Sequence, residues 1–194
     1  MGRKIAGACF FAAAAALVFV MFIFSSQDGT DSSRLSRDVS RFLAERLNPS
    51  YWGYCGTVAR ENVLDFMSHP LRKGAHFAEY AALGALLMGG FMQFRFSMPV
   101  RILFSLLISA VSACADEYHQ RFVTGRAGSA ADVLLDSLGA LCGILFVAFV
   151  CMAVMYMIGS ARLKRGGKKS GAGRKKPQYH RAPPPDGAGT EFRV

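Results

Sequence analysis

An uninterrupted apolar segment covers residues 5–24 and contains no charged side chain. A helix of about twenty such residues crosses the hydrocarbon core of a bilayer, because each residue adds about 1.5 Å of length. A cleaved secretory signal has a shorter apolar core and ends in small residues. Here the segment ends in bulky Phe24 and is followed by Ser25, Ser26 and Gln27. We therefore expect an uncleaved transmembrane helix that ends at these polar residues.

Three further apolar segments cover residues 74–94, 99–115 and 133–158. The chain has 194 residues, of which 52% are hydrophobic, and these are grouped in blocks rather than spread evenly. Arg101 lies near the start of the third segment, where a long side chain can reach the lipid headgroups. The pattern predicts an all-α integral membrane protein built as a bundle of four transmembrane helices.

Basic residues near the ends of the apolar segments predict the orientation. They precede the first segment and flank the short loop between the second and third, and the segment after the fourth is strongly basic. Cytoplasmic loops carry an excess of Lys and Arg, so we expect both termini in the cytoplasm. The loop over 25–73 also has seven basic residues and counts against this orientation, which the basic C-terminal segment decides. The flanking residues are Arg3, Lys4, Arg95 and Arg101.

The loop over 25–73 carries its own helical pattern. Apolar residues recur at helical spacing between a start at Ser32-Ser33 and a stop at Asn48-Pro49. This pattern predicts an extracytoplasmic amphipathic helix that lies on the membrane or caps the bundle. A second short helix is expected over 57–68, with Pro70 near the start of the second span. The recurring apolar residues are Leu35, Val39, Phe42, Leu43 and Leu47.

The apolar segments divide the chain into three parts. Residues 1–4 form a short N-terminus, residues 5–158 the membrane domain, and residues 159–194 a basic, Pro- and Gly-rich cytoplasmic tail that we expect to be disordered. Nine of the 23 Lys and Arg residues fall over 162–181, which suits anionic membrane lipid. Among those basic residues stands a single aromatic, Tyr179, so nucleic acid is a less suitable partner. The five cysteines show neither a disulfide framework nor a zinc pattern.

Acidic and imidazole side chains that adjoin the apolar segments all fall at one membrane face, the outer one in this topology. His76 and Glu79 are three residues apart and share a helix face, as do Asp132 and Asp136, which are four apart. Burying such a group at the centre of a bilayer costs about 3 kcal/mol, and such groups commonly mark a functional site. The sequence therefore predicts a polar site at the outer mouth of the bundle.

The same segments carry a resemblance to the VanZ-like family of bacterial membrane proteins. It covers about 24–150, with the matching blocks in the order and spacing of the family. The resemblance implies a small multi-span protein of the cell membrane, in a family whose namesake is linked to glycopeptide (teicoplanin-type) antibiotic resistance, and it assigns no catalytic residue. The matching residues are Phe24-Ser25-Ser26-Gln27, Arg72-Lys73, Ala75-His76-Phe77, Glu79-Tyr80, Asp116-Glu117, His119-Gln120, Phe122-Val123, Gly125-Arg126, Asp132-Val133 and Asp136.

Two sets of candidate site residues follow. The first set is expected inside the polar pocket, as a ligand or catalytic site or as a buried network that holds the helices together. The second set, expected at the rim, suits a phosphate or carboxylate ligand. Ser129 and Asp132 have the spacing of a capping box at the start of the fourth helix. The first set is His76, Glu79, Glu117, His119 and Asp136, and the second is Arg72, Lys73, Gln120 and Arg126.

Three classes of function remain open at this stage. The site could bind a lipid headgroup, a lipid-linked envelope precursor or an amphiphilic antibiotic without changing it. It could instead belong to a membrane-embedded hydrolase or transferase that acts on a lipid-linked substrate, since His beside a carboxylate is a common acid–base pair. That enzyme could be metal-dependent, although no HExxH spacing is present and the sequence requires no cofactor. A proton-conducting transporter is the least favoured, because no acidic residue lies in mid-span.

Overall fold

The computed structural model describes residues 2–27 and 29–172, with side chains described over 2–27 and 33–161. Every regular element in these ranges is a helix. The chain divides into two compact units, Met1–Met152 and Ala153–Val194, and the first holds five whole helices and the beginning of the sixth. Of the tail predicted to be disordered over 159–194, residues 159–172 are helical, as the end of the sixth helix, and the remainder lies outside the described residues from 173 onward. The helices are α1 (Gly2–Ser25), α2 (Gly29–Leu47), α3 (Pro49–Tyr54), α4 (Thr57–Phe91), α5 (Met98–Gln120) and α6 (Ala130–Ala172).

Three helices are long and apolar enough to cross a membrane, by length and composition: Gly2–Ser25, Met98–Gln120 and Ala130–Ala161. They include the first, third and fourth predicted spans. The first ends at Ser25, as the polar residues after Phe24 predict. Many of their large apolar side chains are uncovered; Phe19 is 67% exposed and Phe146 is 66% exposed. Apolar surface of this extent is typical of helices that contact lipid.

The second predicted span differs from expectation. Residues 57–68 and 74–91 belong to one continuous 35-residue helix, α4, with Pro70 inside it. A proline within a helix removes one backbone hydrogen bond. Packing on both sides of Pro70 holds α4 together: Leu64 is only 1% exposed in the first half, and the second half is packed inside the bundle. The expectation of a separate short helix before a new span is therefore wrong.

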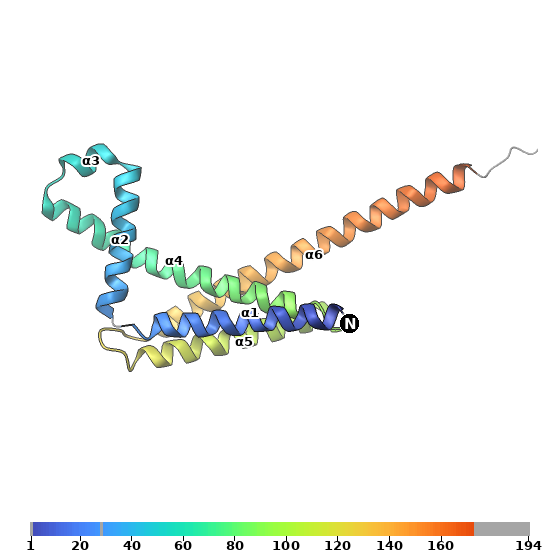
Figure 1. The fold of residues 1–194 in the computed structure, drawn as a ribbon, viewed down its shortest axis with the longest axis horizontal. Helices are drawn as coiled ribbons and strands as arrows, with labels where there is room; N and C mark the ends of the chain where they lie inside the picture. The colour runs from blue at the N-terminus through green and yellow to red at the C-terminus, as the bar shows by residue number, and fades with distance from the viewer. Residues whose placement is uncertain (1, 28, 173–194) are drawn as a thin grey trace, which may run out of the picture. The chain divides into compact units, whose positions relative to one another are not determined.

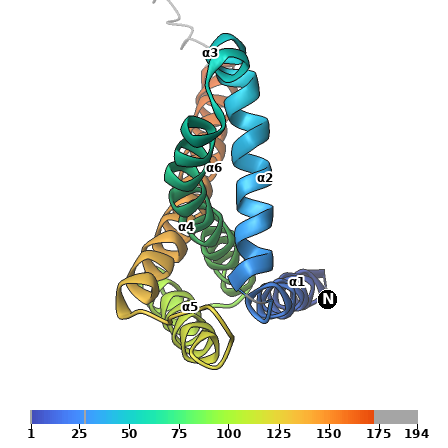
Figure 2. The ribbon, with the colours of Figure 1, turned by 90° about the vertical axis from the view of Figure 1, so that its left-hand side faces the viewer.

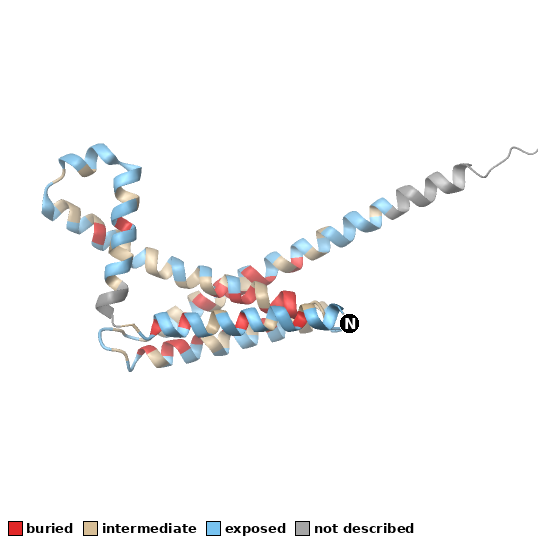
Figure 3. Ribbon diagram, in the orientation of Figure 1, coloured by how far each residue is buried: buried red, intermediate tan, exposed pale blue. Residues whose placement is uncertain are grey.

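The second half of α4 forms the centre of the bundle. Along it, Tyr80, Leu83 and Leu87 are buried against Ala14 and Met21 of α1, with further packing from α5 and α6. Figures 1 and 2 show α1 and α5 running beside this part of α4, and Figure 3 shows the buried residues on their facing sides. Because protein surrounds this half of α4, it can carry more polar residues than a helix that faces lipid.

Glycines allow α4 and α6 to cross closely. A Cβ on Gly143 would overlap the carbonyl oxygen of Ala81, and a Cβ on Gly139 would overlap that of Phe77. The crossing is reciprocal, because a Cβ on Gly84 of α4 would overlap the backbone of α6. Small residues that bring helix backbones together are a common basis of helix association in membranes. This crossing fixes the start of α6 beside α4, which is where the polar residues of both helices lie.

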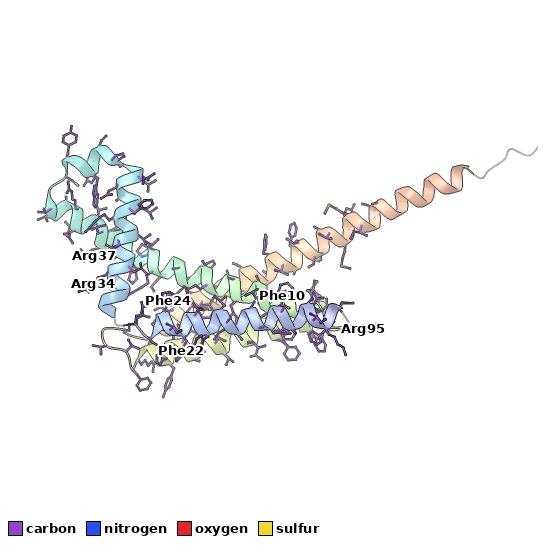
Figure 4. The ribbon with its side chains drawn as sticks, in the orientation of Figure 1. Phe10, Phe22, Phe24, Arg34, Arg37 and Arg95 are labelled. Atoms are coloured by element: carbon purple, nitrogen blue, oxygen red, sulfur yellow. The ribbon has the colours of Figure 1, made fainter. Side chains whose placement is uncertain are left out.

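Helix α2 is attached to the first half of α4 through polar contacts. The guanidinium of Arg37 forms ion pairs with Glu61 and, at 3.1 Å, with Asp65, and Ser40 is fully buried. Figure 4 shows Arg37 on α2. Three apolar residues of α2 are left exposed: Leu35, Val39 and Phe42 are 57%, 40% and 56% exposed. The helix expected here is present, and Arg37 joins it to α4 while these three apolar side chains remain uncovered.

Candidate functional site

A polar cavity of about 330 Å³ lies where α4, the end of α5, the loop over 121–129 and the start of α6 meet. Each of these segments supplies charged or hydrogen-bonding side chains. The cavity is within the size range of small-ligand sites. Its lining residues are His69, Arg72, Lys73, His76, Glu117, Gln120, Gly125, Arg126, Ala127, Asp132, Leu135 and Asp136.

The loop over 121–129 is held firmly against α5. The Ser129 N–H donates to Glu117 Oε2 at 2.9 Å, and the Ser129 hydroxyl accepts from the Ala131 N–H at 3.1 Å, which caps α6. Gly128 lies against the backbone of Glu117, where a Cβ would overlap the carbonyl oxygen, and Gly125 has a φ of 74°. In the expected capping box, the Asp132 carboxylate would accept a hydrogen bond from the Ser129 N–H. In the structure the Glu117 carboxylate accepts that bond instead. This anchoring fixes the position of Arg126.

Asp132 instead forms an ion pair across the cavity. Its Oδ1 lies 2.5 Å from the Lys73 Nζ, and the two side chains are 28% and 39% exposed. The pair joins α4 to the first turn of α6, so it links two walls of the cavity. Lys73 therefore has a protein carboxylate as its partner and is less available to a ligand than an unpaired cation.

Arg72 and Arg126 lack such a partner. Neither forms an ion pair with a carboxylate of the described residues; Arg126 donates only to the Phe24 carbonyl oxygen, at 3.3 Å. The Nε of Arg126 is buried and bonds to no described group. Burial and the positive charge of nearby Arg72 lower the pKa of Arg126. An anion between the two guanidinium groups would remove this repulsion and accept hydrogen bonds from both.

The acidic side of the cavity contains a carboxylate without partners. Asp136 is 1% exposed, and both of its oxygens are buried without a hydrogen bond from any described residue. Leaving a buried acceptor unpaired costs about 1–3 kcal/mol, and more for a charged group. Asp116, by contrast, accepts a hydrogen bond from the Gln120 Nε2 at 2.9 Å. Asp136 is therefore the acid in this cavity with the most unmet hydrogen-bonding capacity.

A second, mainly apolar cavity of about 480 Å³ lies between α1, α2 and α4. Three residues line both cavities: Arg72, His76 and Arg126. The polar and apolar cavities therefore adjoin each other at these side chains. The apolar part of the lining is Met21, Phe24, Leu35, Val39, Pro70, Leu71 and Ala75, and Glu79 also faces this cavity.

The structure brings most of the predicted site residues together, with two differences. Glu79 lines the apolar cavity rather than the polar one. His119 lines neither cavity: its Nε2 lies 3.1 Å from the Ser26 hydroxyl oxygen, and its ring centroid lies 4.3 Å from that of Phe22 on α1. The predicted residues that do line the polar cavity are Arg72, Lys73, His76, Glu117, Gln120, Arg126, Asp132 and Asp136.

His69 and Leu135 also line the polar cavity, although neither was predicted to do so. His69 precedes Arg72 by three residues and Lys73 by four, so on a continuous helix all three share a face. Pro70 conceals this signal in the sequence, because it predicts a helix boundary between His69 and Arg72. Leu135 precedes Asp136, and an isolated leucine within an apolar segment carries no such signal.

Metal-ligand geometry is absent from the described side chains. Over 2–27 and 33–161, no group of three or more His, Cys, Asp or Glu side chains is placed to hold a metal ion. A stable divalent-metal site generally needs at least three protein ligands with correct distances. The metal-dependent form of the enzymatic hypothesis therefore has no donor set in this part of the chain.

The fold and the polar cavity together define a class of protein: an all-helical integral membrane protein with an ionisable pocket at one end of its bundle. Comparison with models of protein families identifies one family. The family model described as VanZ/LLP1 matches residues 10–157, and the chain belongs to this family. The family resemblance seen in the sequence is thus confirmed. No curated protein and no solved structure matches the chain.

Proposed function

We propose that the protein is a four-span envelope protein of the cell membrane, with both termini in the cytoplasm and the two cavities facing outward. Arg3 of α1 donates to the Met92 carbonyl oxygen at 3.3 Å, and Arg101 donates to that of Phe94 at 2.9 Å. These two basic residues therefore lie beside the loop that contains Arg95, and Figure 4 shows Arg95 at the end of the bundle opposite Phe24. The positive-inside rule makes that end cytoplasmic. The cavities, at the other end, then open on the outer face.

Helix α2 is proposed to lie against the outer membrane surface. Arg37 attaches it to α4, while Leu35, Val39 and Phe42 are uncovered. An apolar stripe on a helix with many charged residues suits the boundary between headgroups and acyl chains.

Labelling of intact cells with a membrane-impermeant maleimide tests the topology. In a Cys55→Ser background, Thr124→Cys should be labelled and Ser97→Cys should not; the reverse result would invert the proposed orientation.

The proposed function is to bind the anionic headgroup of an amphiphile at the outer membrane face. One observation carries it: Arg72 and Arg126 line the same cavity and have no carboxylate partner among the described residues. Arg presents a planar fork that binds phosphate or carboxylate with two hydrogen bonds. A lipid headgroup, a lipid-linked envelope precursor and an amphiphilic glycopeptide-type antibiotic all present such an anion at this depth.

A matched pair of probes tests the proposal on the full chain in dodecyl maltoside. The first probe is radiolabelled 1-oleoyl lysophosphatidic acid, and the second is 1-oleoyl glycerol, which has the same chain but no phosphate. Binding should require the phosphate and should fall about 10- to 100-fold in Arg126→Gln, the equivalent of losing about 1.5–3 kcal/mol of charge-assisted hydrogen bonding. Arg121→Gln is the control, because Arg121 is an exposed arginine of the same loop that lines neither cavity.

Two results would refute headgroup binding. One is equal affinity for the two probes, and the other is unchanged affinity in both Arg126→Gln and Arg72→Gln. Adding a diphosphate lipid and a lipoglycopeptide to the same competition assay would rank the possible ligands.

An enzyme acting on a lipid-linked substrate is a second candidate, and His76 favours it. The Nδ1 of His76 is buried without a hydrogen-bond partner among the described residues, and the side chain lies where the two cavities meet. An imidazole at that point could exchange a proton with a bound headgroup. Incubating the protein with diphosphate lipid and measuring released phosphate tests this. Turnover that is lost in His76→Gln while binding is kept would support an enzyme, and no turnover with tight binding would support a binding protein.

A further inference from the structure

The polar and apolar cavities are adjacent, so one ligand could place a polar part in the first and an apolar part in the second. Arg72, His76 and Arg126 line both spaces, so a molecule whose headgroup contacts the two guanidinium groups has an apolar space directly beside it. The apolar cavity extends between α1 and α2 and is lined by side chains such as Met21 and Leu35. We infer that the protein binds a phosphate-bearing lipid in two parts, with the phosphate between Arg72 and Arg126 and one hydrocarbon chain in the apolar cavity.

The chemistry of the lining supports a lipid chain as the occupant. Phe24 and Leu35 line the cavity and are 48% and 57% exposed, so this space is accessible from the surface that faces the membrane in the proposed topology. The occupant must offer apolar surface to side chains such as Met21 and Leu35 and an anion to Arg72 and Arg126, and a phosphate-bearing lipid offers both. A hydrocarbon chain has no polar group to satisfy, and a phosphate at its end would meet those charges. The inference rests on the proposed headgroup binding and adds a binding site for the hydrocarbon chain of the lipid.

Gly74 provides a way to fill the apolar cavity without disturbing the fold. It lines this cavity, and a Cβ built on it meets no atom within 4 Å. It is also inside helix α4, where replacing glycine usually favours the helix. Gly74→Leu should therefore place a side chain in the proposed path of the hydrocarbon chain. Gly53→Leu is the matched control, because Gly53 lies in α3, also has open space around it and lines neither cavity.

The experiment compares two ligands with one headgroup on the full chain in dodecyl maltoside. The probe with a chain is 1-oleoyl lysophosphatidic acid, and the probe without one is sn-glycerol 3-phosphate, measured by competition. Wild-type protein should bind the lipid at least about 100-fold more tightly than glycerol phosphate, because only the lipid has a hydrocarbon chain that can contact the apolar cavity. Gly74→Leu should weaken lipid binding by about tenfold or more. It should leave glycerol phosphate binding unchanged, and Gly53→Leu should alter neither.

The outcomes separate this inference from the proposed function. If Gly74→Leu leaves lipid binding unchanged while Arg126→Gln weakens it, the headgroup site stands and the chain site is overturned. Equal weakening of both probes by Gly74→Leu would also overturn the chain site, since the substitution would then act on the headgroup. If Arg126→Gln and Arg72→Gln leave lipid binding intact, headgroup binding itself fails, and the two-part inference fails with it.

Discussion

The ammonium of Lys73 on α4 lies 2.5 Å from the carboxylate of Asp132 in the first turn of α6. This ion pair divides the three cations of the polar cavity into two kinds. Lys73 is neutralised by the protein itself, whereas Arg72 and Arg126 have no carboxylate partner among the described residues. Anion binding should depend on the two arginines, and Lys73 should act mainly in holding α4 and α6 together.

Lys73→Gln should therefore change the affinity for lysophosphatidic acid by less than about threefold, well below the effect of Arg126→Gln. The pair is partly exposed, so its contribution to stability should be at most about 1 kcal/mol in a double-mutant cycle with Asp132→Asn. Thermal unfolding in dodecyl maltoside measures the second quantity. A loss of affinity in Lys73→Gln as large as that in Arg126→Gln would mean that the ligand displaces Asp132.

The close crossing of α4 and α6 predicts that Gly143→Ala is destabilising. The added Cβ would overlap the carbonyl oxygen of Ala81, and a backbone atom cannot move aside as the end of a flexible side chain can. Overpacking of this kind costs about 1–3 kcal/mol. The midpoint of thermal unfolding should fall clearly. Gly74→Ala is the control in the same bundle, with open space around it, and should be neutral or slightly stabilising.

Most of the helical fold could be predicted from the sequence. Length and apolar composition alone are enough to identify three of its segments as transmembrane helices. α1, α5 and α6 are long enough and apolar enough to cross a membrane. The second predicted span could not be bounded in the same way, since α4 is one helix from Thr57 to Phe91. The residue before a proline disfavours helix locally, which made Pro70 an expected boundary. The burial of Leu64 and the ion pair that Glu61 forms with Arg37, a residue of another helix, outweigh that local preference.

The site could be predicted in its position but not in its details. The apolar segment of the third predicted span ends at residue 115, so the sequence does not show in which directions Glu117 and His119 point. In the structure α5 continues to Gln120. Glu117 and His119, two residues apart on a helix, then face nearly opposite sides, because each residue turns the helix by about 100°. Glu117 therefore reaches the polar cavity while His119 contacts Phe22 and Ser26 of the first helix and its end.

The hydrogen bond from the Ser129 N–H to Glu117 predicts that Glu117 supports the loop that carries Arg126. Glu117→Leu removes the acceptor and should destabilise the protein by about 1–3 kcal/mol, and it should also weaken lysophosphatidic acid binding by displacing the arginine. Glu117→Gln keeps an acceptor oxygen and should restore much of both properties. The two measurements are thermal unfolding and probe affinity. If Glu117→Gln is as damaging as Glu117→Leu, the negative charge rather than the hydrogen bond is required.

The unpaired carboxylate of Asp136 predicts which lipid headgroups the protein binds most tightly. Its two buried oxygens accept no hydrogen bond from the described residues, so a headgroup with N–H donors could satisfy them. Wild-type protein should bind lysophosphatidylethanolamine about tenfold more tightly than lysophosphatidylcholine, whose quaternary ammonium has no N–H. Asp136→Leu should abolish this preference and raise the unfolding temperature of the ligand-free protein, because an unpaired buried acceptor is removed. A lower unfolding temperature together with an unchanged preference would show that Asp136 has a structural partner and does not contact the headgroup.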